Sequence, residues 1–190
     1  MTGFSIPMLR TTSLALLCVA SLAAVQPVRA QIHAHVRAGK SPRGSAISAG
    51  YTNASNGTVQ HQGGRILHGA NGASYAGHNS FSRNADGSAS SSHAGSGTTA
   101  AGGQFSTSGA YTRNASGAIS GRSQTQGTGP HGSYDASTTT ANGSTTHDTT
   151  ATNNATGVTY DGQTTYTKGQ GFTHSGSCTN ASGQTVACGK

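Results

Sequence analysis

The sequence contains no glutamate and only four acidic residues. These are Asp86, Asp135, Asp148 and Asp161, and they lie far apart along the chain. Enzymes that rely on general acid–base chemistry bring two carboxyl groups together, one to donate a proton and the other to accept one or to attack. Serine and histidine are too abundant for any Ser-His-Asp combination to stand out. The composition therefore predicts a protein that is not an enzyme and that uses no cofactor.

Large apolar side chains are also scarce. From residue 31 onward the chain has only twelve Leu, Ile, Val and Phe residues, far below the fifth or so that is usual in globular chains. Burying them at roughly 1.5–3 kcal/mol each cannot offset about 1 kcal/mol of backbone entropy per ordered residue. A conventional hydrophobic core is thus excluded. The chain is either a disordered linker, or it is held together by backbone hydrogen bonds and close packing of small residues.

The one long apolar run lies near the start. Residues 11–25 (TTSLALLCVASLAAV) follow Arg10 and are too few to span a bilayer comfortably. Val28 and Ala30 place short side chains ahead of Gln31, as at a signal-peptidase site. These features predict a secretory signal peptide over residues 1–30 and an exported protein, secreted or at the cell surface. No later segment is apolar enough to predict a membrane span.

Glycine recurs at a period of fifteen residues through the middle of the chain. The periodic positions are Gly57, Gly72, Gly87, Gly102, Gly117 and Gly132. Such a period predicts stacked supersecondary units. After residue 132 the glycine spacing becomes shorter and less regular.

Turn-forming residues precede many of these glycines. Four asparagines begin an Asn-Ala-x-Gly tetrapeptide: Asn84, Asn114, Asn154 and Asn180. There the asparagine is expected to cap a type I turn and the glycine to adopt a positive φ. Asn56-Gly57, Asn71-Gly72 and Asn142-Gly143 suit two-residue hairpin turns.

About eleven residues separate successive turns, and their Thr, Ser, Ala, Tyr and Phe content predicts strands. Segments with aromatic residues alternate with segments that have none, which indicates a two-strand unit of about thirty residues. The residues predicted to form aromatic ladders are Tyr51, Tyr75, Phe81, Phe105, Tyr111 and Tyr134. The expected fold is all-β, a β-solenoid or a stacked β-hairpin array. We expect a flexible leader over 31–50 and the repeat domain over 51–190; which strand face points inward stays open.

Two cysteines, Cys178 and Cys188, follow the predicted signal. An even number in an exported chain, on either side of the Asn180–Gly183 turn, predicts a disulfide that closes the last hairpin. A two-residue turn at 181–182 would set Cys178 opposite Thr185. The pairing therefore requires either a bulge at Gly183 or an irregular loop.

His33 is a candidate metal ligand, because it becomes the third residue after cleavage at Ala30. A free amino group, two backbone amides and this imidazole would form a square-planar nitrogen site for Cu(II) or Ni(II). The simpler interpretation is a terminal segment without a ligand. The other histidines show no ligand spacing and are expected to be exposed strand residues.

The charge of residues 31–190 is modest, with nine Lys and Arg against four Asp, a net charge of +5. The cations are spread along the chain without a cluster, which is not typical of a specific nucleic-acid site. Regular cations suit solvated strand edges, where they discourage unwanted pairing. Acidic polysaccharide and extracellular matrix remain as partners that such a surface could bind.

The Gly-, Ser- and Asn-rich strand–turn–strand repeats over about 51–183 resemble curli-type functional amyloid subunits. That resemblance implies an exported bacterial protein whose repeats stack into cross-β fibres. We therefore expect a structural subunit of an extracellular fibre or biofilm matrix that pairs with copies of itself. The alternative is a monomeric secreted or surface-associated adhesion or binding module, whose terminal disulfide blocks end-to-end growth. The Thr-dense segment 137–157 adds an ice-binding surface as a third hypothesis, and a disordered secreted protein is a fourth.

Overall fold

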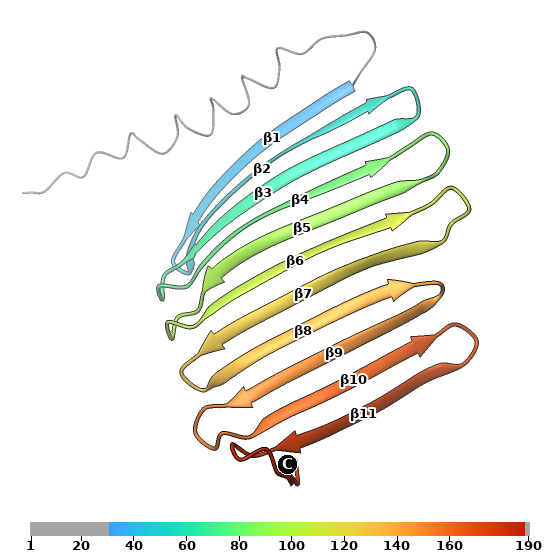
Figure 1. Cartoon of the computed structure of the whole chain (residues 1–190). Coiled ribbons are helices and arrows are strands. Elements are labelled where there is room, and N and C mark those ends of the chain that lie inside the picture. Colours follow the sequence, from blue (N-terminus) through green and yellow to red (C-terminus); the bar gives the residue numbers. More distant parts are fainter. Residues whose placement is uncertain (1–30, 189–190) are drawn as a thin grey trace, which may run out of the picture.

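The computed structural model describes residues 31–188, and all their regular structure is β-strand. Each strand pairs antiparallel with the next, so the order of strands in the sheet is their order in the chain (Figure 1). The strands are β1 (Gln31–Ser41), β2 (Gly44–Ser55), β3 (Thr58–Gly69), β4 (Ser74–Arg83), β5 (Ala89–Thr98), β6 (Gln104–Arg113), β7 (Ile119–Gly129), β8 (Gly132–Ala141), β9 (Ser144–Asn153), β10 (Thr159–Thr167), β11 (Gly171–Thr179) and β12 (Thr185–Val186). The all-β prediction is confirmed, as a hairpin array rather than a solenoid. The predicted signal peptide lies outside the described residues.

The fifteen-residue period arises from strands of ten residues joined by loops of five. In the loop 84–88, the Asn84 amide donates to the Ser88 carbonyl (2.8 Å) and the Gly87 amide donates to the Asn84 carbonyl (3.0 Å). The φ of Gly87 is 84°. This is a type I turn followed by a glycine bulge, and the loops 69–73, 99–103, 114–118 and 180–184 have the same bonding. The prediction of positive φ is confirmed at the glycines of all four Asn-Ala-x-Gly tetrapeptides, Gly87, Gly117, Gly157 and Gly183. Gly72 and Gly102 also have positive φ.

Four loops have only two residues, and the one at Asn142-Gly143 lies where the period breaks. Asn56 and Gly57 have φ of 50° and 76°, and Asn142 and Gly143 have 52° and 76°, as type I′ hairpin turns require. Asn71 differs from the prediction, since it lies within a five-residue loop in which only Gly72 has a positive φ.

Two predicted turn residues take other roles. Gly132 is the first residue of β8, opposite Gly129, and it lacks the positive φ of the other periodic glycines. The two-residue loop before it begins with Pro130, whose fixed φ starts a turn without a glycine bulge. The loop after β9 is capped by Asn153 instead of Asn154, because the Asn153 side chain accepts from the Ala155 amide (2.8 Å). The Asn154 side chain donates to the carbonyl of Gly129, the last residue of β7 (3.1 Å).

The predicted flexible leader is wrong. Residues 31–41 form β1, and β2 begins at Gly44, with every β1 residue paired to β2. The sequence does carry a strand signal here, because Ile32, Ala34 and Val36 alternate with polar residues at a two-residue period. The basic, Pro-containing segment that follows made residues 31–50 resemble a flexible segment.

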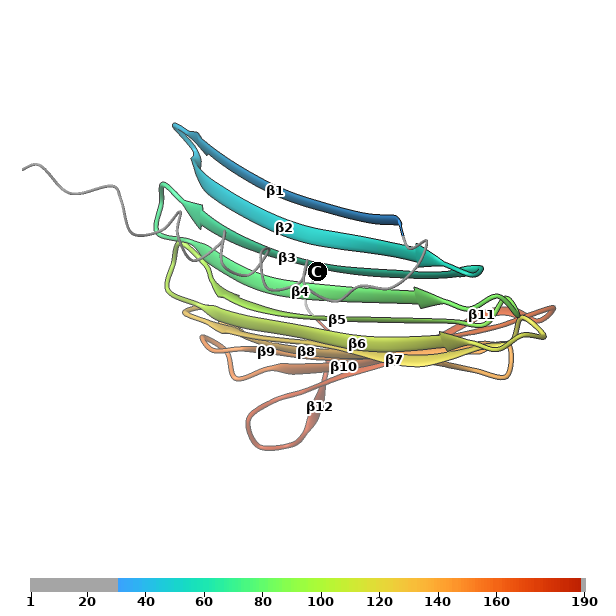
Figure 2. The ribbon, with the colours of Figure 1, turned by 90° about the horizontal axis from the view of Figure 1, so that it is seen from above.

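The sheet is a single curved layer whose faces are both open to solvent (Figure 2). Among residues 31–188 the buried hydrophobic residues are Ala136 and Cys178 alone. Large side chains such as Phe172, 76% exposed, stay in water. Order therefore comes from the backbone ladder and from cross-strand side-chain pairs instead of a core. No helix occurs in the described chain, and hence none that is long and apolar enough to cross a membrane.

Candidate functional site

The register decides which side chains share a face, because directly opposite residues point to the same side of a sheet. One row crosses eight strands from β4 to β11 and alternates large with small residues. Its members are Tyr75, Gly97, Phe105, Gly127, Tyr134, Ala151, Tyr160 and Cys178. We call the side that carries this row the aromatic face and the opposite side the hydroxyl face.

The aromatic face holds every described Phe and Tyr except one. Besides the row above, it carries Phe81, Tyr111, Tyr166 and Phe172. Tyr51 opposes Gln62, which in turn opposes Ser80, and this places Tyr51 on the hydroxyl face. The prediction that Tyr51 joins the ladder is therefore wrong. The predicted proximity of Tyr75 and Phe105 is confirmed, with ring centroids 6.1 Å apart and planes inclined by 7°.

Tyr75, Phe105, Tyr111 and Tyr160 lie against strand glycines. A Cβ added to Gly95 would lie 2.8 Å from Cε2 of Tyr75, and one added to Gly97 would lie 2.8 Å from Cζ of Phe105. Tyr160 covers Gly176 in the same way, with its Cε2 2.9 Å from the added Cβ. Since only glycine leaves this space, each ring rests on bare backbone and turns its outer surface to solvent. All strand glycines except Gly64 and Gly171 lie on this face.

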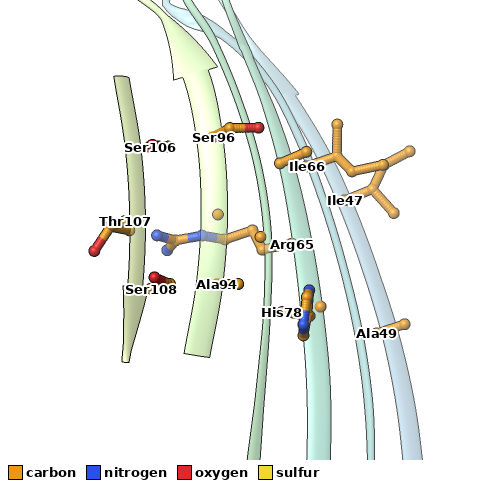
Figure 3. A pocket seen from close by; sticks show the side chains of 14 residues that line it. Ile47, Ala49, Arg65, Ile66, His78, Ala94, Ser96, Ser106, Thr107 and Ser108 are labelled. Atoms are coloured by element: carbon orange, nitrogen blue, oxygen red, sulfur yellow. The ribbon is translucent and has the colours of Figure 1, made fainter. Parts of the chain in front are cut away.

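The hydroxyl face is built from short side chains joined by bonds between hydroxyls. Ser80 and Ser92 lie 2.7 Å apart, and Thr152 and Thr159 lie 2.9 Å apart. A shallow groove of about 680 Å³ crosses this face over β2–β6 (Figure 3). Its lining includes Ile47, Ile66, Ala76, Ala94, Ser96 and Ser106. The first half of this face is therefore a shallow groove in which two isoleucines lie among Ala, Gly and Ser residues.

Charged side chains are distributed unevenly between the faces, although Lys40 and Arg122 lie on the hydroxyl face. Arg37, Arg65, Arg83 and Arg113 all lie on the aromatic face. The described strands place no acidic residue there, because Asp135, Asp148 and Asp161 all lie on the hydroxyl face. There Gln163 donates to Asp148 (2.7 Å), and Thr150 donates to Asp161 (2.7 Å). The guanidinium of Arg65 lies 5.8 Å from the Tyr75 ring centroid, a cation–π distance.

Histidines gather on the aromatic face without forming a metal centre. His35, His93, His147 and His174 share one row across the sheet. Two of them form hydrogen bonds with threonines on the neighbouring strand: Nδ1 of His147 lies 2.8 Å from the Thr138 hydroxyl, and Nδ1 of His174 lies 2.9 Å from the Thr164 hydroxyl. Within residues 31–188 no group of three His, Cys, Asp or Glu side chains is placed to hold a metal. His33 lies opposite Thr52, and its proposed metal site, which depends on a free amino group at residue 31, stays a prediction.

The two edges of the sheet differ. All eleven residues of β1 are exposed, and no strand lies beyond them in the described chain. At the other edge β12 pairs only with Cys178 and Thr179 of β11. The predicted disulfide between Cys178 and Cys188 is present, with a Cα–Cα distance of 5.3 Å. The bulge loop over 180–184 sets Cys178 opposite Val186, so the bond holds the chain just beyond β12 against this corner.

Equivalent loops are capped by different side chains. In the loop 114–118 the Asn114 side chain accepts from the Ala118 amide (2.9 Å), and in the loop 180–184 Asn180 does the same for Gln184 (2.9 Å). In the loop 84–88 the carboxylate of Asp86, instead of the asparagine side chain, accepts the hydrogen bond from the amide of the last loop residue, Ser88. The hydroxyl and the amide of Ser88 both donate to it, and they lower the pKa of Asp86 below its ordinary value of 3.8.

Sequence reasoning found the Tyr75–Phe105 pair, most of the loops and the disulfide. It missed that four arginines share the aromatic face while every aspartate of the described strands lies on the hydroxyl face, where Arg122 also lies. The signal was present: Arg83 and Arg113 follow Phe81 and Tyr111 at a spacing of two, which puts each arginine on the same side as its aromatic neighbour. No known protein family matches this chain, and neither does any curated protein or solved structure. The resemblance to curli-type subunits accordingly stays a prediction.

Proposed function

We propose that residues 31–190 form a structural subunit of an extracellular fibre or matrix, which self-assembles by pairing exposed strands of successive copies. The observation that carries the proposal is the bare edge of β1, eleven exposed residues long, on a sheet that has almost no buried core. Unpaired backbone amides and carbonyls at such an edge are a template for another strand. The open residues 171–177 of β11 provide a second edge.

Two different edges favour growth over closure. A joint between β11 of one copy and β1 of the next uses two unlike surfaces, and an interface of this kind propagates unless a rotation closes it. Because β1 and β11 run in the same direction, a joint that keeps all aromatic faces on one side pairs them in parallel. An antiparallel joint turns each successive copy over. A parallel joint therefore gives a fibre with the aromatic face on one side and the hydroxyl face on the other. An antiparallel joint gives a fibre in which both sides show the two faces in alternation.

The test is electron microscopy and fibre diffraction on purified residues 31–190, aged at increasing concentration under oxidising conditions. We expect fibres with a meridional reflection near ~4.7–4.8 Å. Two lysine variants on the hydroxyl face locate the joint: Ala38→Lys on the β1 edge and Ala94→Lys in the middle of the sheet. Edge growth predicts that only Ala38→Lys slows polymerisation. Monodisperse particles at all concentrations would contradict the proposal.

A second candidate, a monomeric adhesion or binding module, is favoured by the disulfide-held corner at β12. If that corner blocks growth, the oxidised protein stays monomeric and the Cys178→Ser/Cys188→Ser variant polymerises. If both forms polymerise at the same rate, the corner is no cap and the fibre remains the better candidate.

A further inference from the structure

We propose that copies of this chain also associate face to face, with the aromatic face of one copy packed on the hydroxyl face of the next. This contact uses the two broad surfaces of the sheet, whereas the proposed fibre joins its edges, so either contact can form without the other. Three properties of the faces carry the inference: the placement of their charges, their exposed apolar side chains, and their area and curvature.

Opposite charges lie on opposite faces and in opposite halves of the sheet. The aromatic face carries four arginines, all between β1 and β6: Arg37, Arg65, Arg83 and Arg113. The hydroxyl face carries three aspartates, on β8, β9 and β10: Asp135, Asp148 and Asp161. The sheet itself separates the two groups, so they cannot pair within one copy. They can pair between copies when an aromatic face meets a hydroxyl face.

Charge also selects the orientation of the two copies. Packed sheets keep their strand axes within about 30° of each other, so the second copy is either unrotated or turned by half a turn about the sheet normal. Without rotation the aspartates meet the aromatic face of β8–β10, whose described strand residues include no arginine or lysine. Half a turn about the centre of β1–β11 lays β9 over β3 and β8 over β4. Asp148 and Arg65 both lie within two residues of the middle of their strands, so these two side chains meet.

The same half turn brings exposed apolar side chains together. On the aromatic face the exposed rings of Tyr166 and Phe172 lie opposite each other on β10 and β11. On the hydroxyl face Ile47 and Ile66 lie opposite each other on β2 and β3 and point to the same side (Figure 3). Half a turn lays β10 and β11 over β2 and β1, so the two rings cover the end of the sheet that holds the isoleucines. Stacking therefore removes from water the apolar surface that a single copy leaves exposed.

The faces are large enough for a stable complex. The strands β1–β11 have nine to twelve residues each and together cover about 1,600 Å² per face, at ~4.8 Å between strands and ~3.3 Å per residue. A specific protein interface takes about 800 Å² from each partner. The layer is also curved (Figure 2), so one side is concave and the other convex. Two copies nest when unlike faces meet, whereas two like faces would touch over less of their area.

The experiment is sedimentation velocity of oxidised residues 31–190 with single charge reversals on strands away from both edges. Arg65→Asp and Asp148→Arg should each weaken self-association by about tenfold or more, because each sets like charges against one another. An equimolar mixture of the two variants should recover it, since each variant offers the charge that the other lacks. Arg122→Asp is the matched control: it changes the net charge as Arg65→Asp does, but on the hydroxyl face, and should not weaken association. Circular dichroism checks that all three variants keep the sheet.

Recovery on mixing supports stacking, because a loss of folding or of edge pairing is not repaired by a second variant. If neither reversal changes association, the copies join by their edges alone, which overturns stacking and leaves the fibre proposal standing. If both reversals weaken association and the mixture does not recover it, unlike faces do not meet and the proposal is wrong. A wild-type protein that stays monomeric at all concentrations overturns it as well. Recovery without a meridional reflection near ~4.7–4.8 Å would support stacking while contradicting the fibre.

Discussion

The two faces of this sheet are made by the same strands and solve the absence of a core in different ways. On the aromatic face several rings rest on strand glycines, as Tyr75 does on Gly77 of its own strand and on Gly95 of the neighbouring strand. On the hydroxyl face, short side chains of similar size bond one another in pairs, as Ser80 and Ser92 do. On the aromatic face a ring requires a glycine at one particular position. On the hydroxyl face one short side chain can replace another at many positions.

The comparison teaches where this sheet is vulnerable. A ring over a glycine excludes water from the backbone ladder below it, and the arrangement fails if either partner changes. A hydroxyl pair at a water-exposed surface can exchange its partner for solvent at little cost. Substitutions of equal size should therefore have unequal effects on the two faces.

The largest difference is expected for glycine. In Gly97→Val the new Cβ would clash with the Ser74 carbonyl and lie 2.8 Å from Cζ of Phe105, so we expect a loss of about 1–3 kcal/mol in the free energy of unfolding. Gly64→Val on the hydroxyl face meets only the Gly77 carbonyl at 3.5 Å, and a β-branched residue favours a strand. Its stability should be unchanged or greater by up to about 1 kcal/mol. Denaturant unfolding of both variants measures the difference, and equal losses would contradict it.

A smaller effect is expected from ring pairing. A double-mutant cycle of Tyr75→Ala and Phe105→Ala should give a coupling energy of about 0.5–1.5 kcal/mol, because the parallel rings are adjacent. The matched cycle pairs Tyr51→Ala with Phe105→Ala and should give none, since the register puts Tyr51 on the other face. A coupling of similar size in both cycles would mean that the effect is not local to the aromatic face.

Removing a hydroxyl pair should matter less. Thr152 and Thr159 lie 2.9 Å apart on the hydroxyl face, and Thr152→Val/Thr159→Val keeps their shape. We expect the free energy of unfolding to change by no more than about 0.5 kcal/mol. A loss above about 1 kcal/mol, measured by the same unfolding experiment, would show that hydroxyl bonds hold this face together.

The smallest effect concerns the loops, which belong to neither face. The Ser88 hydroxyl and amide lower the pKa of Asp86, so its ionised form is favoured in the folded state. This contribution to stability is fully present above the unfolded pKa and is lost as pH falls through the lowered folded pKa. The difference in unfolding midpoint between the wild-type protein and Asp86→Asn should therefore shrink on acidification. The loop 114–118, capped by Asn114, provides a counterpart without a titrating group.

Local chemistry made much of the fold predictable. Asn56-Gly57 and the Asn84–Gly87 loop were predictable because a positive φ is demanding and few residues accept it. The disulfide was predictable because only two cysteines follow the predicted signal. The role of Asn154 was not predictable, since its partner is the Gly129 carbonyl at the end of β7, 25 residues away. The strand over 31–41 was missed because its own alternation is weak and its stability comes from pairing with β2.

The sequence by itself determined that this chain alternates strands and loops, because turn geometry depends on a few neighbouring residues. It also determined that no ordinary core exists, because the large aliphatic side chains are too few. Only the tertiary structure decided which residues share a face. A five-residue loop returns the chain in one register and a two-residue loop returns it in the other, so the short loop at Asn56-Gly57 is enough to carry Tyr51 to the face opposite Phe81. A shift of one residue reverses every side chain of a strand, and that choice is made by the register across the whole sheet.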